Sequence, residues 1–460
     1  MKFRSHQSTG EPMARSTSTT LPSSSIDPGL TEAATRIIHK LLRPFDGSLA
    51  LRLWNDVTHS FGQNAPSFTL VLRDPAVLRD LVLKRGPIPL ADAYFHGRLD
   101  VEGDLYAALG LKRHFQSLSL TGRERMGLMV DALRLTFAPT KKIAPAGEVR
   151  ATTQFTHDHS LESDRAAITH HYDVSNDFYK LFLDERMVYS CAYFHADDDS
   201  LEMAQRQKLD HICRKLRLKP GERFLDIGCG WGALVIWAAK HYGVRAHGIT
   251  LSQAQLDEAN KRIAAEGLQD RITVELRDYR ALEGEGVYDK VSSVGMFEHV
   301  GLANLPQYHA TVHRVLKPNG LFLNHGITHE EDGWKPTVDT EFINRYVFPD
   351  GELDRVSAIQ AGMERAQFEI QDVENLRIHY AKTLRHWVSR LEASHDEAIG
   401  HVSEATYRVW RLYMAASALE FESGGTGIHQ ILASRRPDAH PYAQPVPLTR
   451  RDLYDSEKAC

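Results

Sequence analysis

A glycine-rich loop in the middle of the chain is the segment best suited to hold a ligand. Residues 224–232 read FLDIGCGWG, so an apolar stretch runs directly into three alternating glycines. Glycine permits a tight turn, and it lets a ligand lie against bare backbone. The apolar stretch 233–239 follows at once and predicts a helix. The segment therefore predicts a buried strand, a ligand-binding turn and the start of a helix.

The spacing of these glycines separates the loop from one familiar nucleotide site. Gly228, Gly230 and Gly232 follow the pattern G-x-G-x-G, with Asp226 just before them, whereas dinucleotide enzymes use G-x-G-x-x-G. The loop resembles motif I of class I S-adenosylmethionine (SAM) methyltransferases. In such a loop the backbone can take the amino-acid end of SAM, and Asp226 can accept from its ammonium group or from the loop amides. A plain strand-turn-helix, or another nucleotide site, is the alternative.

Polar residues follow two further predicted strands, where a cofactor bound to such a sheet would reach them. Thr250 and Gln255 stand where many related sheets place an acidic residue for the ribose hydroxyls. Ser252 lies between them and is as readily explained as a helix N-cap. Asp278 can accept from the adenine amino group, with Tyr279 beside the ring, or it can be a solvated loop carboxylate.

Two titratable residues are candidates for acid or base chemistry. The stretch 293–301 reads SVGMFEHVG and lacks the N/D-P-P-Y/F pattern of many amine methyltransferases, which argues against methylation of a base or an amide. Its Glu298 is flanked by apolar residues, so burial would raise its pKa unless it is partnered. A buried carboxylate that ties down the loop is the alternative. His325 ends another predicted strand and is either an acid or base or a satisfied structural histidine.

The elements around these residues alternate in the way of a doubly wound sheet. Short apolar runs rich in β-branched and aromatic residues predict strands covered on both faces, with ligands at their carboxyl ends. The predicted strands are 223–227, 246–250, 272–276, 290–294, 320–324 and 426–434, and the predicted helices are 232–241, 252–266 and 305–316.

Composition along the 460 residues indicates five parts. Residues 1–28 are rich in Ser and Thr and predict a flexible leader, whereas 29–115 mix helical and alternating patterns like a small α+β domain. A helix is predicted over 31–42, with Thr31 as its cap. Residues 116–165 predict a helical and then polar connector, 166–436 the α/β domain, and 437–460 a mobile tail.

Charge, cysteine usage and hydropathy limit which binding partners and which cellular compartment we expect for this chain. The formal net charge is −5, so nothing drives the whole chain toward nucleic acid. The four cysteines form no C-x-x-C pair and predict reduced thiols in a cytosolic protein. No apolar run approaches the ~18 residues of a membrane span, so we expect any work on lipid to be done from the membrane surface. His157, His159, His170 and His171 complete no ligand set, and no metal is predicted.

Four motifs in order carry a resemblance to one family. They are HYDVSNDFY at 171–179, YSCAYF at 189–194, LDIGCGWG at 225–232 and VGMFEHVG at 294–301. Together they resemble cyclopropane-fatty-acyl-phospholipid synthases, and the related mycolic acid cyclopropane synthases share much of the set. The resemblance spans about 165–435. Residues 29–115 also resemble the small N-terminal domain of the longer, phospholipid-acting members.

The resemblance implies a fold and a reaction. The fold is α/β, the doubly wound sheet of class I SAM methyltransferases with a small N-terminal α+β domain. The reaction transfers a methylene from SAM to the cis double bond of an unsaturated acyl chain in a membrane phospholipid, with bound bicarbonate as the base. By motif, the bicarbonate holders are Glu298, His325, Tyr380 and the backbone at Cys191 and Ile327. The cofactor-binding residues are Tyr189, Ser190, Asp226, Gly228, Gly230, Thr250, Gln255, Asp278 and Tyr279.

Several further expectations follow from the sequence and from the same resemblance. Tyr172, Tyr193, Phe194 and Phe297 are expected to stabilise a carbocation on the acyl chain. Helical spacing of apolar residues over 382–421 predicts helices that pack on the sheet, form the wall of an acyl pocket, or both. We expect a cytoplasmic homodimer at the inner face of the membrane, with the N-terminal domain docking on the bilayer or dimerising.

Two alternatives to this function remain open. A relative can add a methyl group without closing the ring, or act on another lipid or small molecule. A non-catalytic lipid-binding protein could keep the fold. The intact glycine loop, together with Glu298, His325 and Tyr380, counts against that last class.

Overall fold

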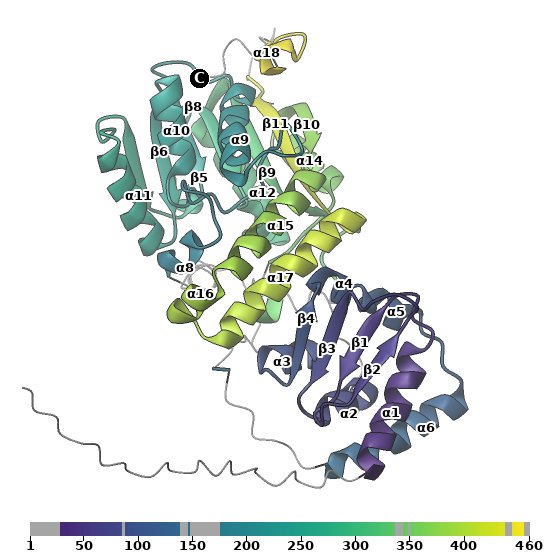
Figure 1. Ribbon diagram of the computed structural model, residues 1–460. Coiled ribbons are helices and arrows are strands. Elements are labelled where there is room, and N and C mark those ends of the chain that lie inside the picture. Colours follow the sequence, from purple (N-terminus) through teal and green to yellow (C-terminus); the bar gives the residue numbers. More distant parts are fainter. Residues whose placement is uncertain are drawn as a thin grey trace, which may run out of the picture.

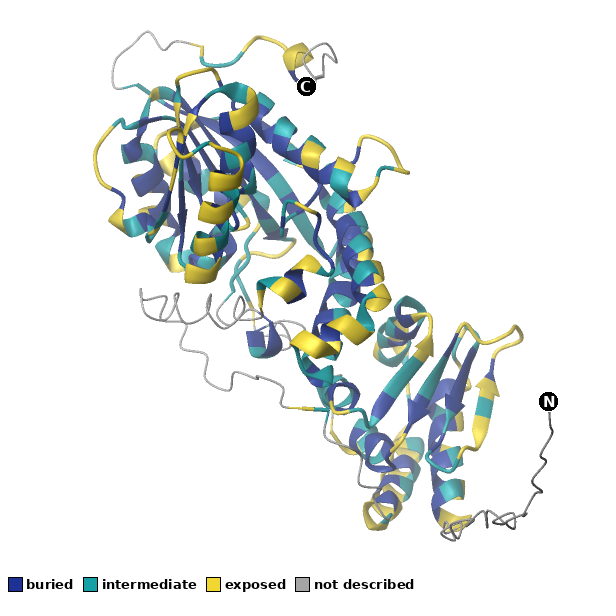
Figure 2. Cartoon of the chain, turned by 60° about the vertical axis from the view of Figure 1, so that its left-hand side comes forward, coloured by how far each residue is buried: buried dark blue, intermediate teal, exposed yellow. Residues whose placement is uncertain are grey.

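Two sheets, joined by long helices, organise the chain (Figure 1). The computed structural model describes residues 28–84, 88–138, 146–147, 175–335, 344–347, 351–437 and 444–454. A seven-stranded sheet carries the larger domain, and a four-stranded sheet lies in the smaller N-terminal one. Figure 2 shows buried positions along the strands of both sheets and along the helices that join them.

The large sheet has the predicted doubly wound topology. Its strand order is β10-β11-β9-β8-β5-β6-β7, and β5 is parallel to both β6 and β8. From β5 the chain continues to β6 and then β7 on one side, and it then crosses to β8 on the other side of β5. The carboxyl ends of β5 and β8 thus form the switch point where such sheets bind ligands. The strands are β5 (Arg223–Ile227), β6 (Arg245–Thr250), β7 (Ile272–Leu276), β8 (Tyr288–Val294), β9 (Leu316–His329), β10 (Phe368–Asn375) and β11 (Thr426–Arg435).

Helices cover both faces of this sheet, as predicted. One apolar cluster joins the sheet to α9 (Leu201–Lys215), α10 (Ala233–Tyr242) and α11 (Gln253–Ala265). A second cluster joins the opposite face to α12 (Leu305–Val315) and α14 (Val356–Arg365). Because both faces are buried, the strands lack an exposed polar side, which explains their short continuous apolar runs.

The small domain is α+β and differs in detail from the sequence prediction. Its sheet has the order β2-β1-β3-β4, and β2 was not predicted. The first helix begins at Pro28, so Thr31 lies inside it and is not its cap. The helix predicted in the connector, α6, packs against α1 and α2 and so belongs to this domain. The elements are α1 (Pro28–Leu42), β1 (Leu49–Arg52), β2 (Thr58–Phe61), β3 (Phe68–Leu72), α2 (Ala76–Leu83), α3 (Ile88–Phe95), β4 (Leu99–Gly103), α4 (Leu105–Leu109), α5 (Leu111–Ser117), α6 (Gly122–Arg134) and the turn η1 (Leu135–Phe137).

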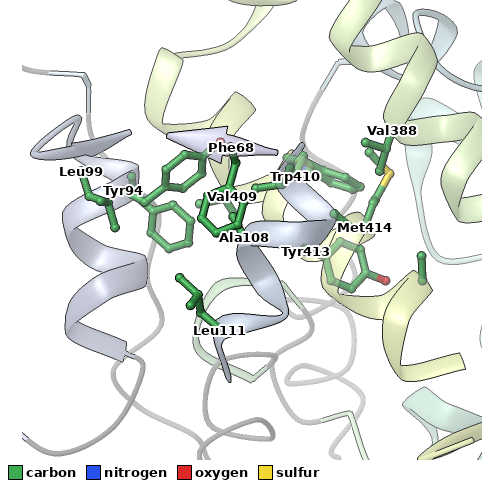
Figure 3. Close-up of a cluster of buried hydrophobic side chains, with 14 of the residues drawn as sticks. Phe68, Tyr94, Leu99, Ala108, Leu111, Val388, Val409, Trp410, Tyr413 and Met414 are labelled. Carbon is green, nitrogen blue, oxygen red and sulfur yellow. The ribbon is translucent and has the colours of Figure 1, made fainter. Parts of the chain in front are cut away.

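Two antiparallel helices, α15 (Arg377–Ala393) and α17 (Glu404–Ser423), connect the two domains. Figure 3 shows the apolar cluster at the junction, where Phe68 and Tyr94 of the small domain approach Trp410 and Met414. Polar contacts reinforce it: Arg408 lies 3.3 Å from the Asp100 carboxylate, and other arginines of α17 and α15 contact the small domain. The two domains therefore share one continuous core.

Two further properties concern the described part of the chain. No helix there is both long and apolar enough to cross a membrane. Cys191, Cys213 and Cys229 are buried and unbonded, whereas Cys460 lies outside the described residues. The histidine groups at 157–159 and 170–171, and Tyr172, also lie outside them.

Candidate active site

A cavity of about 140 Å³ lies at the carboxyl ends of β5, β6 and β8, at the switch point. Its walls come from the glycine loop, the turns after β6, β7 and β8, and the segment before α9. All the residues predicted to bind the cofactor line it: Tyr189, Ser190, Asp226, Gly228, Gly230, Thr250, Gln255, Asp278 and Tyr279.

The glycine loop leaves a bare backbone surface on this cavity. The amides of Gly228 and Cys229 both donate to the Ile249 carbonyl at 3.0 Å, which pins the loop to β6. Gly228 and Gly230 have φ angles of +79° and +53°, a region that glycine adopts without strain. A Cβ at Gly230 would meet no protein atom within 4 Å, so the loop is open on the side where a ligand would lie. The residues present therefore fit a SAM-sized ligand held by backbone.

Asp226 is buried at the end of β5. Its Oδ1 accepts a hydrogen bond from the Ser292 hydroxyl of β8 at 2.6 Å. Burial raises the pKa of Asp226 to about 6, although the hydrogen bond from Ser292 and the charge of Lys208 lower it. The carboxylate thus links the two strands of the switch point directly beneath the loop.

The polar group after β6 is organised internally. The Thr250 hydroxyl donates to Oε1 of Gln255 at 2.7 Å, so the two side chains form one unit on the cavity wall. Ser252 is the N-cap of α11, since its hydroxyl accepts from the Gln255 amide at 3.3 Å. Of the two interpretations of Ser252, the helix cap is the one that the structure supports.

We therefore expect Ser252→Ala to act on stability and not on the cofactor. Losing the cap leaves an amide at the start of α11 without its acceptor, which costs about 1 kcal/mol in the free energy of unfolding. The affinity for SAM, measured by calorimetry, should stay within about 2-fold of wild type. A larger loss of affinity at unchanged stability would place Ser252 in the cofactor site.

Asp278 differs from the solvated carboxylate considered as an alternative. It is largely buried and accepts from Nε and Nη2 of Arg280 at 2.8 and 2.9 Å. The Arg280 guanidinium also lies 5.2 Å from the ring centre of Tyr279. Asp278 therefore holds a fixed place on the cavity wall, and the guanidinium that holds it was not predicted.

A second and larger cavity, of about 570 Å³, adjoins the first at the domain junction. The two cavities share the wall residues Tyr189, Ser190, Val294, Gly295 and His299. The remaining walls of the larger cavity come mainly from β9, from the α15–α17 pair, and from α3 and α4 of the small domain. The structure brings all the predicted catalytic residues to this one cavity: Cys191, Glu298, His325, Ile327 and Tyr380.

The two carboxylate oxygens of Glu298 have different surroundings. Oε1 accepts from the Ile327 amide at 2.8 Å and ties the turn η3 (Phe297–His299) to β9. Oε2 is buried and has no hydrogen-bond partner among the described residues. Burial raises the pKa of Glu298 to about 7, against the lowering effect of the Ile327 amide. One oxygen thus fulfils the loop-tying role, and the other remains for chemistry. The Ile327 amide is engaged by Glu298, and the expected contact between the Ile327 backbone and bicarbonate stays a prediction.

His325 is buried with one of its ring nitrogens engaged. Its Nδ1 lies 3.4 Å from Nε2 of Gln430, and its Nε2 has no partner among the described residues. Burial lowers the pKa of His325 well below its usual value, and the charges of Lys208 and Lys215 lower it further. The ring is therefore neutral at pH 7. The Gln430 contact sets the tautomer: when the Gln430 amide donates to Nδ1, the single ring proton lies on Nε2, which can then donate to a ligand in the cavity.

Comparison with known proteins identifies the family to which this site belongs. A sequence model of the mycolic acid cyclopropane synthetase family matches residues 159–431, more than half of the chain. The chain belongs to this family. The match includes all residues of both cavities that were predicted from the sequence.

Relatives of the cyclopropane synthase family extend the match. A probable fatty acid methyltransferase of Pseudomonas putida is 40% identical over 88% of this chain and 96% of its own length. The cyclopropane-fatty-acyl-phospholipid synthase of Escherichia coli K12 is 43% identical over 58% of this chain and 66% of its own. The solved mycolic acid cyclopropane synthase CmaA1, complexed with SAH and CTAB, superposes with a TM-score of 0.56 at 34% identity, covering 59% of this chain and 98% of its own.

In this methyltransferase of the cyclopropane synthase family, Cys191 lies on the wall of the larger cavity. Its thiol is fully buried, with Sγ 3.2 Å from the Ala192 carbonyl. Burial raises the pKa of Cys191, so its reactive thiolate form is disfavoured. Tyr380 lies nearby on α15 with its ring 4.7 Å from that of Phe421. Cys191 thus forms part of the cavity wall, and its burial disfavours the thiolate that a nucleophile would need.

The aromatic residues of the cavity differ from those predicted. Tyr193 lies outside it, with its ring stacked between His211 and His379 at 4.2 and 4.7 Å. Phe194 and Phe297 also lie outside the lining. The described aromatic residues on the walls are Tyr189, Trp334, Tyr380, Tyr413 and Phe421. The α15 and α17 residues among them show that these helices both pack on the sheet and form the cavity wall.

Lys208 is the main residue that sequence reasoning missed. It is 2% exposed, lines the smaller cavity and donates from Nζ to the Ser190 hydroxyl at 2.8 Å. Ser190 lies on both cavities, so this lysine positions a side chain at their boundary. The signal was present in the sequence: Lys208 falls four and seven residues after Ala204 and Leu201, on the apolar face of its helix.

Proposed function

We propose that this chain transfers a methylene from SAM to the cis double bond of unsaturated acyl chains in membrane phospholipids. The observation that carries the proposal is the pair of adjoining cavities. One has a bare glycine backbone suited to SAM, and the other is mainly apolar with an acid and a histidine on its wall. The shared wall would bring a methyl donor and an acyl chain together.

The rim of the larger cavity supports a phospholipid as the source of the acyl chain. Lys112 of the small domain lies 3.0 Å from Glu420 of α17, and Glu331 lies 2.8 Å from Lys335. These four residues border the cavity; Glu331 and Lys335 are exposed, whereas Lys112 and Glu420 are half-buried. An apolar interior with a charged, exposed rim fits an acyl chain inside and a charged head group outside.

The polar atoms on the wall fit a small oxyanion such as bicarbonate. Glu298 Oε2 and His325 Nε2 are buried on the same cavity without partners in the described part of the chain. Such atoms are costly to bury unless a ligand satisfies them. When bound, bicarbonate would supply an oxygen base, held by Glu298, His325 and Tyr380. With a pKa near 7, Glu298 can be protonated and donate a hydrogen bond to an anion instead of repelling it.

The residues of the site account for the demands of the reaction. When bound, SAM would supply an electrophilic methyl group: the electron pair of the alkene would form the new carbon–carbon bond as the methyl–sulfur bond breaks and S-adenosylhomocysteine leaves. The alkene carbon that remains is then cationic, and the rings of Tyr380, Tyr413 and Phe421 offer it electron-rich faces. Apolar walls exclude water that would trap the cation. Loss of one proton from the transferred methyl lets the ring close, and the Glu298–His325 side of the cavity is where that proton would be taken up.

A second function is favoured by one comparison. The Pseudomonas putida relative, which matches 88% of this chain, is called a probable fatty acid methyltransferase. A methyl group added without ring closure would use the same two cavities. The difference would depend on where a base stands relative to the transferred methyl.

We also propose that the protein acts as a homodimer at the cytoplasmic face of the membrane. The buried, unbonded cysteines of the described residues suit a reducing compartment. A peripheral site at the inner face would give the larger cavity access to phospholipid.

Deuterated SAM distinguishes these functions in one experiment. The purified protein is given SAM with a fully deuterated methyl group and a phospholipid with a cis alkene. Ring closure should leave two of the three deuterons on the lipid and remove the alkene signals in NMR. A methyl branch that keeps all three deuterons on a chain that still has a double bond, or a deuterated methylene branch with its own alkene signal, would favour the non-cyclising alternative. If the phospholipid stays unlabelled while a free unsaturated fatty acid, offered in a parallel reaction, becomes labelled, the phospholipid assignment is wrong.

A further inference from the structure

Helix α6 of the small domain is apolar on two different faces. Its buried face, with Leu128 and Ala132, packs on α1 and α2. A second set of apolar residues is exposed: Leu133 is 54% exposed and Phe137, in the turn η1, is 87% exposed. At about 100° per residue they fall on one side of the helix. We call this set the apolar stripe: Met126, Met129, Val130, Leu133 and Phe137.

Basic residues border the apolar stripe. Arg123 and Arg134 lie along one edge, and Arg125 lies along the other. Beyond Arg123 and Arg134, a groove between α6 and α1 adds Arg36, Lys40 and Arg43. The segments 36–43 and 122–137 together hold six Arg or Lys against two Asp or Glu, in a chain whose net charge is −5. The two acids are engaged: Glu124 caps α6, and Asp131 is paired with Arg36 at 2.7 Å and with Arg134 at 3.6 Å, so the two segments keep an excess of basic residues.

We propose that the apolar stripe of α6 inserts into the headgroup region of an anionic phospholipid bilayer, with the bordering arginines on lipid phosphates. A helix of this kind, with an exposed apolar face and basic edges, lies in the plane of a membrane surface. The inference deepens the proposed function, on which it rests, by naming the surface that meets the substrate membrane.

The charges favour lipid over a second copy of the chain. A two-fold dimer through the apolar stripe would place the same patch on both subunits, so that arginines would face arginines. An anionic bilayer instead complements both edges. Figure 1 shows α6 beside α1, on the side of the small domain away from α17, so the catalytic domain leaves this surface accessible.

Vesicle flotation with the full-length protein tests the proposal. The vesicles contain phosphatidylcholine with or without phosphatidylglycerol. We expect Leu133→Glu to lower binding to the anionic vesicles at least ~10-fold, because it places a carboxylate in the apolar stripe. Arg123→Gln with Arg134→Gln should weaken binding and reduce its dependence on salt. The matched control is Ile399→Glu on α16 (His395–His401), where the wild-type side chain is 42% exposed; it should leave binding within ~2-fold.

Three outcomes would overturn the proposal. Leu133→Glu could float like wild type, or Ile399→Glu could lose binding equally. In light scattering without lipid, Leu133→Glu could convert a dimer into a monomer, which would assign the apolar stripe to a second copy. Thermal unfolding confirms that each variant is folded.

Turnover of phospholipid dispersed in detergent micelles separates this inference from the proposed function. If Leu133→Glu impairs only membrane docking, it should keep wild-type turnover in micelles. If the proposed function is wrong, the wild-type protein should also be inactive in micelles.

Discussion

We expect the Glu298→Gln protein to lose at least ~10³-fold in turnover while it binds SAM within about 3-fold of wild type. Glu298 lines the larger cavity but not the smaller one, so the cofactor should be indifferent to the change. Glutamine keeps the oxygen that accepts from the Ile327 amide, and so it keeps the link between η3 and β9. What it removes is the titratable oxygen that faces the cavity.

The same substitution should stabilise the protein at high pH. Because burial raises the pKa of Glu298 to about 7, the wild-type carboxyl contributes its full stability only below about pH 4.5. That contribution is lost as the pH rises through 7. The free energy of unfolding of Glu298→Gln, relative to wild type, should therefore rise by about 3 kcal/mol between pH 4 and pH 8. Urea titrations at the two pH values measure it.

Glu331→Gln is the matched control for this prediction. Glu331 borders the same cavity but is exposed and paired with Lys335. Its removal should change turnover by less than about 3-fold, because a solvated charge contributes little. If Glu298→Gln turned over at the wild-type rate, Glu298 would have no part in the reaction. If the relative stability did not change with pH, its carboxyl would not be the buried acid described above.

The α/β core and the two cavities were predictable because their signals are local. β5 and β7 have the predicted bounds, since each is a short apolar run bounded by glycine or charged residues. Residues at the ends of parallel strands meet at one edge of the sheet, whatever their distance in sequence. Thr250, Asp278 and Glu298 could therefore be assigned to the same edge of the sheet from strand positions together with the family motifs.

The features that sequence reasoning missed depend on long-range packing. β2 reads THSF and buries only Phe61, so an edge strand of this kind has no apolar alternation to detect. α6 was assigned to a connector, because nothing in its own sequence shows that it packs on α1. Tyr193 was expected at the acyl chain, yet its ring is held by two histidines from α9 and α15. Such positions are decided by neighbours that are close only in the folded chain.

Replacing Lys208 with methionine should weaken the binding of SAM by ~10- to 100-fold. SAM carries a carboxylate at its amino-acid end, and Lys208 is a buried cation on the cavity where that end would lie. A hydrogen bond to a charged group is worth about 1.5–3 kcal/mol, which gives the expected loss. Methionine keeps the length and apolar packing of the side chain. The substitution also removes the donor that positions the Ser190 hydroxyl.

The pH dependence of SAM binding tests whether the charge of the Lys208 ammonium group causes this loss of affinity. Burial lowers the pKa of Lys208 to about 8, against Asp184 and Asp226, which raise it. The cation is therefore present below pH 8 and is lost above it, so that wild-type affinity for SAM should fall between pH 7 and pH 9.5. Lys208→Met should start from a lower affinity and show a smaller fall over this range, namely the part that comes from the α-ammonium group of SAM, which also titrates near pH 8. Calorimetric titration over this pH range gives both values.

Lys215 provides the control on the same helix face. It lies two turns after Lys208 in α9 and is equally buried, but it contacts Glu374 and Asp372, at 2.5 and 3.3 Å, and lines neither cavity. Lys215→Met should destabilise the fold, because it removes a buried cation that faces the carboxylates of Glu374 and Asp372. Its affinity for SAM should nevertheless stay within about 3-fold of wild type. Equal loss of affinity in both variants would mean that a buried charge in α9 maintains only the helix, and that Lys208 has no direct part in holding the cofactor.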